Sequence, residues 1–340
     1  MARGGRGSGR GARTLRLYIE GPKGEPDAYT VTRDRYIQSA RRHAAVARRI
    51  KATIGRGFEG LEPIIDKVDA IVGFEFPQEL IRRRGANVRW LHNLGAGVEH
   101  LMPIDWLPRR ATLTNNAGVS AAKAGETAMM AILALNTRLP VLIEQQRRRL
   151  WKQLPTTVVR GQTVLVVGVG GLGGEAARNA KSFGMRVIGV RRSGRSHPHV
   201  DEMHRPRDLH RLLPRADFVV ATAPLTPESK HLLGRAELNR MKPGACLVNL
   251  GRGDVVDCVA LASLLRRGRL GGAYLDVTPK EPLPKGSPLW STPNLLLAPH
   301  CTADDPHAYL SLTFEIVFEN ARRLLAGRPL VNRVRPALGY

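Results

Sequence analysis

The sequence predicts an α/β protein with two domains, each a parallel sheet with helices on both faces. The chain has 340 residues, which is long for a single hydrophobic core. Short apolar segments alternate with helical ones along most of it, a pattern typical of parallel sheets covered by helices. A glycine-rich turn at 168–173 joins one such apolar segment to a helix. These observations predict Rossmann-like or flavodoxin-like domains, the second of them a doubly wound parallel sheet.

The first domain is predicted to comprise residues 14–115, preceded by a disordered basic tail at 1–13. Its expected helices include a basic one at 33–49. A glycine-rich turn follows the fourth strand, and its backbone N–H groups could hold a carboxylate, although a simple helix-entry turn fits the sequence equally well. The other expected elements are strands at 14–19, 52–54, 68–74, 88–93 and 112–116, and a helix at 78–84.

The second domain is predicted at 116–306. A helix over 120–136 is rich in Ala, Met and Leu, so it is expected to lie away from the surface and to run between the domains. A last helix at 308–325 is expected to return to the first domain, which 307–340 would complete. The predicted strands are 164–167, 187–190, 217–221, 246–250, 272–275 and 295–298.

The turn after strand 164–167 has the pattern G-x-G-x-x-G, and a helix is expected over 175–183. In such a turn the first glycine permits a tight bend, the second lets the backbone approach a pyrophosphate, and the third lets helix and strand pack closely. An ordinary strand-to-helix turn is the alternative. Because strand and helix flank the motif, it predicts a dinucleotide site made by Gly168, Gly170, Gly171, Leu172 and Gly173.

The end of strand 187–190 indicates which dinucleotide is bound. An NAD site has Asp or Glu there to hold the ribose 2′-OH, whereas this chain has Arg191, Arg192 and Ser193. Guanidinium groups pair with phosphate oxygens, so NADP(H) is favoured over NAD(H). A solvated basic loop is the alternative in so arginine-rich a chain.

The composition is that of a globular protein with an unusual positive charge. The net charge of +24 would attract anionic ligands, but no nucleic-acid-binding motif accompanies it, so no specific nucleic acid is expected as a partner. The three cysteines form no C-x-x-C pair, and no apolar segment is long enough to span a bilayer. These features predict a cytoplasmic protein with no membrane partner.

Polar residues follow three of the predicted strands, at the sheet edge where ligands bind in such folds. Arg252 lies between two glycines, Asp276 and Glu281 follow the next strand, and His300 follows the last. Each alone has an ordinary alternative, as a surface arginine, a loop carboxylate or a structural histidine. Together they are candidates for carboxylate binding and acid/base chemistry.

In order, these motifs resemble the D-isomer-specific 2-hydroxyacid dehydrogenases. The resemblance runs from about residue 90 to 306 and rests on GVGGLGGEAARNAKSFGMRVIG, APLTPESKHLLGRAELNRMKPGACLVNLGRGDVVD and YLDVTPKEPLPKGSPLWSTPNLLLAPH. It implies NAD(P)-dependent hydride transfer between a small 2-keto acid and its D-2-hydroxy acid. It also implies a homodimer formed through the cofactor domains.

The resemblance implies a role for each candidate residue. His300 would be the acid/base, Glu281 would orient its imidazole and favour the protonated form, and Arg252 would bind the substrate carboxylate. Asp276 would contact the nicotinamide carboxamide. The turn Ala96-Gly97-Val98 would donate N–H groups to the same carboxylate, and the cofactor cleft would be lined by Ala223, Pro224 and Leu250.

The residues after His300 depart from the family's usual small turn, which leaves the substrate open. Arg191 makes NADP(H)-dependent glyoxylate or hydroxypyruvate reductases the most similar functional group. The alternative is a dinucleotide-sensing corepressor that binds without turnover. Retention of Arg252, Glu281 and His300 weighs against that alternative, because a sensor has less need of an acid/base set.

Overall fold

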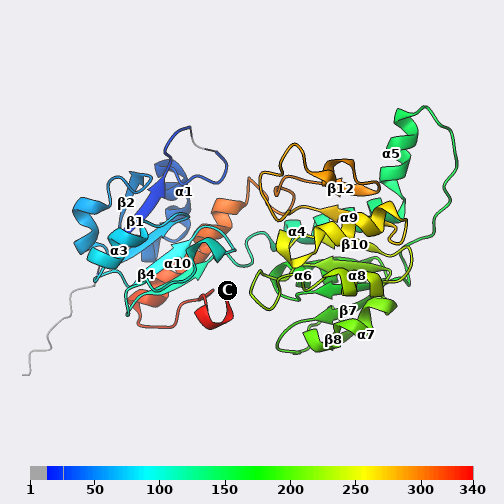
Figure 1. Cartoon of the computed structure of the whole chain (residues 1–340). Helices are drawn as coiled ribbons and strands as arrows, with labels where there is room; N and C mark the ends of the chain where they lie inside the picture. Colours follow the sequence, from blue (N-terminus) through cyan, green and yellow to red (C-terminus); the bar gives the residue numbers. More distant parts are fainter. Residues whose placement is uncertain (1–13, 26, 340) are drawn as a thin grey trace, which may run out of the picture. The chain divides into compact units, whose positions relative to one another are not determined.

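The computed structural model describes residues 14–25 and 27–339, so the predicted tail at 1–13 lies outside the described residues. The chain divides into two compact units, with breaks between Val119 and Ser120 and between Asp305 and Pro306 (Figure 1). Unit 2 is Ser120–Asp305, and unit 1 consists of the described residues on either side of it. Each unit is built on its own parallel sheet.

Unit 2 contains a seven-stranded parallel sheet in the order β12-β11-β10-β9-β6-β7-β8. The first strand in the chain, β6, lies in the middle and pairs with both β7 and β9. The strand order therefore reverses direction at β6, as it does in doubly wound dinucleotide-binding folds. The strands are β6 (Thr163–Val167), β7 (Arg186–Val190), β8 (Glu202–His204), β9 (Phe218–Ala221), β10 (Cys246–Asn249), β11 (Gly272–Leu275) and β12 (Leu295–Leu297).

Both faces of this sheet are buried, which explains why its strands are apolar without alternation. Leu165 and Val167 of β6 join one core cluster, and Val164 and Val166 join another on the opposite face. The first cluster includes residues of α7 (Leu209–Leu212), α8 (Arg235–Arg240) and α9 (Cys258–Arg266). The second includes residues of α4 (Ala121–Asn136) and α6 (Gly171–Ser182).

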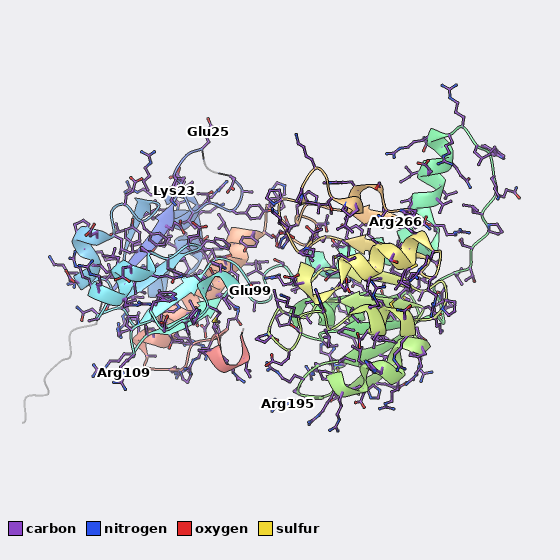
Figure 2. The ribbon with its side chains drawn as sticks, viewed as in Figure 1. Lys23, Glu25, Glu99, Arg109, Arg195 and Arg266 are labelled. Carbon is purple, nitrogen blue, oxygen red and sulfur yellow. The ribbon has the colours of Figure 1, made fainter. Side chains whose placement is uncertain are left out.

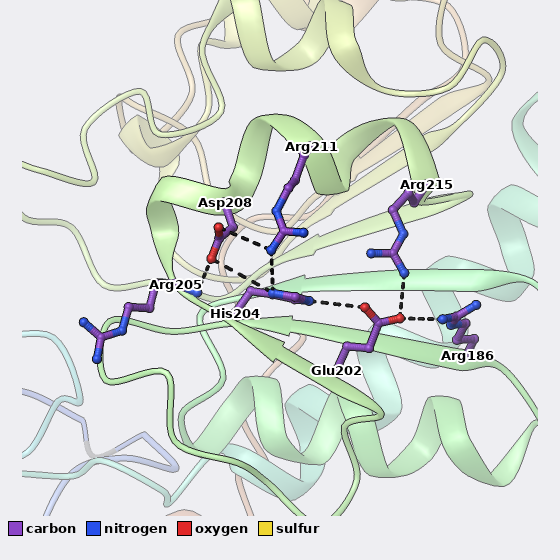
Figure 3. A network of polar contacts seen from close by, with 7 residues as sticks. All are labelled: Arg186, Glu202, His204, Arg205, Asp208, Arg211 and Arg215. Atoms are coloured by element: carbon purple, nitrogen blue, oxygen red, sulfur yellow. Dashed lines mark hydrogen bonds and ion pairs between the residues drawn. The ribbon is translucent and has the colours of Figure 1, made fainter.

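The edge strand β8 is held by charged side chains (Figure 3). Glu202 Oε1 accepts hydrogen bonds from Arg215 Nη2 at 2.6 Å and Arg186 Nη2 at 2.5 Å. Hydrogen bonds from Arg215, and then from Arg186 and His204, lower the pKa of Glu202 to about 2. This network explains how so short and polar a segment stays in the sheet.

Unit 1 contains a five-stranded parallel sheet in the order β2-β1-β3-β4-β5, the flavodoxin-like order. One face packs on α10 (Tyr309–Leu325), whose Phe314, Val317 and Phe318 are buried. The other elements are β1 (Leu15–Gly21), α1 (Arg33–Arg42), α2 (Ala44–Ala47), β2 (Ile50–Arg56), β3 (Ala70–Gly73), α3 (Gln78–Arg84), β4 (Trp90–Asn93) and β5 (Thr112–Asn115), with short 3-10 turns that include η2 (Glu99–Leu101).

The structure corrects several expected elements. The helix expected at 33–49 is broken at His43, whose φ of −116° and ψ of 33° are not helical. The helix after the glycine turn begins at Gly171 and not at 175. Helix α4 is part of unit 2. Two elements were not expected, the polar edge strand β8 and α5 (Leu139–Arg147), which projects from the rest of unit 2 in Figure 1.

Among the residues that the structure describes, none of the helices alone is long and apolar enough to cross a bilayer. Taken together, α4 and α5 have the length and apolar composition of a membrane span, but the two helices are bent by 59° at their junction.

Candidate active site

The clearest constellation in unit 2 is the pair of His300 and Glu281. The Nδ1 atom of His300 lies 2.7 Å from Oε2 of Glu281, although the two residues are 19 positions apart. Glu281 Oε1 accepts a hydrogen bond of 2.9 Å from the backbone N–H of Thr278, which fixes the carboxylate. Because a carboxylate only accepts, Nδ1 donates, and Nε2 is the ring nitrogen left for a ligand. The side chains are 46% and 37% exposed, so a ligand can reach the pair.

The backbone around His300 is held by Asp276. The His300 N–H donates to the carbonyl oxygen of Asp276 at 2.8 Å, and the buried Asp276 carboxylate accepts from the N–H groups of Cys301 and Thr302, both at 3.2 Å. His300 has a φ of 51°, in the left-handed region that non-glycine residues seldom adopt. Such a conformation costs about 1–3 kcal/mol and persists where neighbouring contacts impose it, commonly at functional sites.

Arg252 lies in the loop after β10. This strand pairs with β11, which Asp276 follows. The Nη1 atom of Arg252 donates to the carbonyl oxygen of Gly251 at 2.8 Å, and Asn249 Nδ2 donates to the Arg252 carbonyl oxygen at 3.0 Å. A Cβ added at Gly253 would lie 2.1 Å from the carbonyl carbon of Thr278. Only glycine therefore lets the Arg252 loop pack against the segment that fixes Glu281.

The structure thus brings three sequence-predicted residues to one edge of the sheet. Strands β10, β11 and β12 are parallel neighbours, so Arg252, Asp276 and His300 follow strand ends at the same edge. Sequence reasoning missed the Thr278 N–H that orients Glu281, and it placed Asn249 in the lining of the cofactor cleft without its hydrogen bond to the Arg252 loop. Asn249 carried one signal, since it is a polar residue at the end of a buried strand, whereas the backbone donor of Thr278 carried none.

The glycine turn between β6 and α6 has the form that a dinucleotide requires. Gly168 has a φ of 105°, and a Cβ there would lie 2.5 Å from the backbone nitrogen of Ala223. At Gly170 an added Cβ would meet no atom within 4 Å, so the backbone is open to a ligand. The N-terminus of α6, where Gly171, Leu172 and Gly173 begin the helix, carries no side-chain cap. Its free N–H groups suit a phosphate, so these residues fit a dinucleotide.

Ala223 and Leu250 lie beside the glycine turn. A Cβ on Gly251 would lie 2.7 Å from the carbonyl oxygen of Ala223, and Leu250 is buried in the cluster that contains β6. Pro224 follows Ala223, and its carbonyl oxygen accepts a hydrogen bond of 2.7 Å from Ser229 Oγ. The loops after β9 and β10 therefore pack closely, next to the turn after β6.

Arg191, Arg192 and Ser193 form the loop after β7. Arg191 donates from Nε to the carbonyl oxygen of Arg195 and from Nη2 to that of Ser196, both at 2.7 Å, so its side chain holds the loop in shape. Arg195 lies at the surface of unit 2 (Figure 2). The pKa of nearby His197 is lowered, first by burial and then by the positive charges of His199 and Arg191. The loop carries three arginines, Arg191, Arg192 and Arg195.

Ala96, Gly97 and Val98 lie in unit 1, in the turn between β4 and η2. The carbonyl oxygens of Ala96 and Gly97 accept hydrogen bonds from side chains of the same unit. Ala96 O accepts a hydrogen bond from Asn115 Nδ2 at 2.7 Å, and Gly97 O accepts one from Asn93 Nδ2 at 2.8 Å. Buried asparagine side chains therefore hold the carbonyl groups of this turn.

A two-unit fold with a doubly wound sheet, a glycine turn open to a phosphate and a carboxylate-oriented histidine defines a dinucleotide-dependent oxidoreductase. Residues 129–302 match the family described as D-isomer specific 2-hydroxyacid dehydrogenase, NAD binding domain. The chain belongs to this family, and it is an NAD(P)-dependent oxidoreductase that acts on CH–OH groups.

Three relatives illustrate the similarity. A glyoxylate reductase of Korarchaeum cryptofilum is 37% identical over 61% of this chain and 64% of its own length. A D-isomer specific 2-hydroxyacid dehydrogenase of Xanthobacter autotrophicus, solved in complex with NADPH and MES, has a TM-score of 0.83 at 29% identity, covering 97% of this chain and 100% of that one. An NADPH-dependent glyoxylate/hydroxypyruvate reductase of Sinorhizobium meliloti, in complex with NADP and sulfate, has a TM-score of 0.80 at 25% identity and covers 95% and 99%.

Proposed function

We propose that this protein reduces a small 2-keto acid, glyoxylate or hydroxypyruvate, to the D-2-hydroxy acid and uses NADPH in preference to NADH. The observation that carries the proposal is the 2.7 Å contact between His300 Nδ1 and Glu281, because it leaves Nε2 available for proton transfer. The glyoxylate and hydroxypyruvate reductases among the relatives support the choice of substrate.

In this proposal each residue has one task. His300 donates a proton from Nε2 to the C2 oxygen of the keto acid, and Glu281 stabilises the imidazolium and fixes its orientation. Arg252 binds the substrate carboxylate and polarises the C2 carbonyl, and the N–H groups of Ala96, Gly97 and Val98 bind the same carboxylate. When it is bound, the nicotinamide supplies the hydride. Asp276 holds the backbone of the His300 loop, in addition to the contact with the nicotinamide carboxamide that the family resemblance implies.

The preference for NADPH is assigned to the loop after β7. An acidic residue there would repel a 2′-phosphate, and this loop instead offers Arg192 and the Ser193 hydroxyl on a backbone that Arg191 holds in place. The complexes of two similar structures with NADPH and NADP support this assignment. Gly168, Gly170, Gly171, Leu172 and Gly173 are assigned to the pyrophosphate, with Ala223, Pro224 and Leu250 beside it.

The test follows the loss of NADPH absorbance, and separately of NADH absorbance, with glyoxylate, hydroxypyruvate and pyruvate. We expect turnover with the first two acids and NADPH, which His300→Ala abolishes. Arg192→Asp should lower kcat/KM with NADPH by about 10- to 100-fold, since it replaces a phosphate partner with a like charge. Arg240→Asp on α8 makes the same charge change outside the loop and should leave it unchanged. Tight cofactor binding without turnover would refute the enzymatic proposal.

We also propose that the protein is a homodimer formed through its cofactor units. The projecting segment from α5 to Val158 exposes apolar side chains that a soluble monomer would bury, and Trp151 is 97% exposed. A second copy of this chain is the occupant that the family resemblance favours. Light scattering should give twice the chain mass of 37.3 kDa, and Trp151→Asp should shift the mass toward one chain. A monomeric wild-type protein at micromolar concentration would refute the dimer.

A further inference from the structure

The turn between β4 and η2 has an unusual distribution of hydrogen bonds. The carbonyl oxygens of residues 94–97 each accept a hydrogen bond from a buried asparagine side chain. Asn93 Nδ2 donates to the carbonyl oxygens of Gly95 at 2.9 Å and Gly97 at 2.8 Å. Asn115 Nδ2 donates to that of Ala96 at 2.7 Å, and Asn116 Nδ2 to that of Leu94.

Holding the carbonyl groups also determines where the N–H groups point. In a planar trans peptide the C=O of one residue and the N–H of the next point in opposite directions. The asparagines draw the carbonyl oxygens of 94–97 toward the interior, so the N–H groups of 95–98 are turned away from it. Within the part of the chain that the structure describes, these four N–H groups donate to no protein acceptor. Successive free N–H groups on one side of a turn suit an anion.

One of the three asparagines, Asn116, is itself held by the buried imidazole of His92. Its Nδ1 lies 2.8 Å from Thr114 Oγ1 and its Nε2 lies 2.9 Å from Asn116 Oδ1. Burial lowers the pKa of His92 to about 4, so the imidazole is neutral near pH 7 and has one N–H. That N–H, on Nε2, donates to Asn116 Oδ1, and this orients the Asn116 amide so that Nδ2 faces Leu94 and Thr313.

Asn93 provides a second indication. Its side chain is fully buried, and Nδ2 makes both of the hydrogen bonds to the turn, whereas the buried Oδ1 has no hydrogen-bond partner in the structure. An unpaired buried oxygen is unfavourable, and most buried polar groups avoid it. The contribution of this side chain is therefore its donor group, which acts on the turn.

We propose that Asn93, Asn115 and Asn116 are positioning residues that hold the N–H groups of this turn in place to bind the carboxylate of the keto acid. The inference rests on the proposed function, in which Ala96, Gly97 and Val98 meet that carboxylate. It adds the residues that create the binding geometry. Their removal should weaken substrate binding without changing the hydride chemistry or cofactor binding, because Arg252, Glu281 and His300 lie in the other unit.

The main test is Asn115→Ala, because Asn115 is the least buried of the three. We expect the KM for glyoxylate to rise about tenfold, with kcat and the Kd for NADPH within about twofold of wild type, since uniform binding is lost. Asn320→Ala is the matched control. Asn320 is a buried asparagine of unit 1 away from the turn. Its Nδ2 donates to the Val331 carbonyl oxygen at 3.2 Å, and its Oδ1 accepts from the Val331 N–H at 2.7 Å. It should lower the melting temperature and leave KM unchanged.

A second readout keeps this inference separate from the proposed function. In protein labelled with ¹⁵N-glycine, oxalate should shift the amide signals of Gly95 and Gly97 in the wild type, and the shift should weaken in Asn115→Ala. Wild-type protein without turnover but with this oxalate response would refute the proposed function and retain the anion-binding turn. An unchanged KM in a folded Asn115→Ala variant, or wild-type glycine signals that ignore oxalate, would overturn the inference.

Discussion

Glu281→Gln tests the core of the proposed mechanism with a minimal change in shape. The glutamine oxygen can still accept from the Thr278 N–H, as Glu281 Oε1 does at 2.9 Å. The other half of the side chain then presents an NH₂ group to His300 Nδ1, where the native carboxylate oxygen accepts at 2.7 Å. Two donors would face each other whenever the imidazole is protonated. The variant should therefore disfavour the proton-donating form of His300.

The size of the effect follows from this single contact. A hydrogen bond to a charged group contributes about 1.5–3 kcal/mol, and a tenfold change in rate corresponds to about 1.36 kcal/mol. The lower part of this range applies, because the two side chains are 46% and 37% exposed and solvent screens their charges. We expect kcat/KM for glyoxylate reduction at neutral pH to fall about 10- to 30-fold.

The assay is steady-state oxidation of NADPH with glyoxylate, accompanied by a thermal melt. Glu237→Gln is the matched control, because Glu237 Oε1 lies 2.5 Å from His210 Nε2 and forms a similar pair between α8 and α7. This control should retain wild-type kcat/KM. The reasoning is refuted if Glu281→Gln stays within about twofold of wild type, or if Glu237→Gln loses as much activity.

Three further predictions concern stability. Glu202 has a folded pKa of about 2, below its ordinary 4.5 (Figure 3), so its ionised form stabilises the protein above pH 4.5. This contribution is lost as the pH falls toward 2. Chemical denaturation should show the loss in wild type and not in Glu202→Gln. His92 has a folded pKa of about 4 against 6.5, so acidification from pH 6.5 to 4 should destabilise the protein, and the His92 imidazole should remain neutral by NMR at pH 6. Gly173→Ala should cost about 1–3 kcal/mol in the free energy of unfolding, because its Cβ would lie 2.3 Å from a backbone oxygen of the same turn. Gly170→Ala, with open space around it, should instead weaken NADPH binding with a smaller loss of stability; equal melting temperatures for the two glycine variants would contradict this reasoning.

Sequence patterns predicted most of the elements because both sheets are buried on two faces. Short continuous apolar segments such as 164–167 are typical of strands inside such a sheet, and the glycines that follow them mark where the strands end. The two elements that were not expected share one cause, since β8 and α5 carry little of that signal. Strand β8 is short and polar and depends on arginines from other segments, and α5 has no buried residue among those that the structure describes.

In the candidate site, too, the sequence predicted some features and missed others. The identities of Arg252, Glu281 and His300 followed from motif order, because each stands at a fixed place after a strand. The sequence does not reveal that the Thr278 N–H donates to Glu281, or that the Arg191 side chain donates to carbonyl oxygens of its own loop. These contacts involve backbone donors and acceptors. Such groups are nearly the same in all residue types, so the sequence does not indicate which of them form the contacts.

By itself, then, the sequence determined the class of fold, because that depends on local periodicity and on residue type. It also predicted the glycine turn, and the resemblance to the family supplied the candidate roles of Arg252, Glu281 and His300. The tertiary structure decided which hydrogen-bond partners those residues have. The left-handed backbone of His300, the close packing of Gly253 on Thr278 and the asparagines beneath the 94–98 turn are examples. Each joins segments that are distant in the chain, and only the folded packing of strands and loops brings such segments within hydrogen-bond distance.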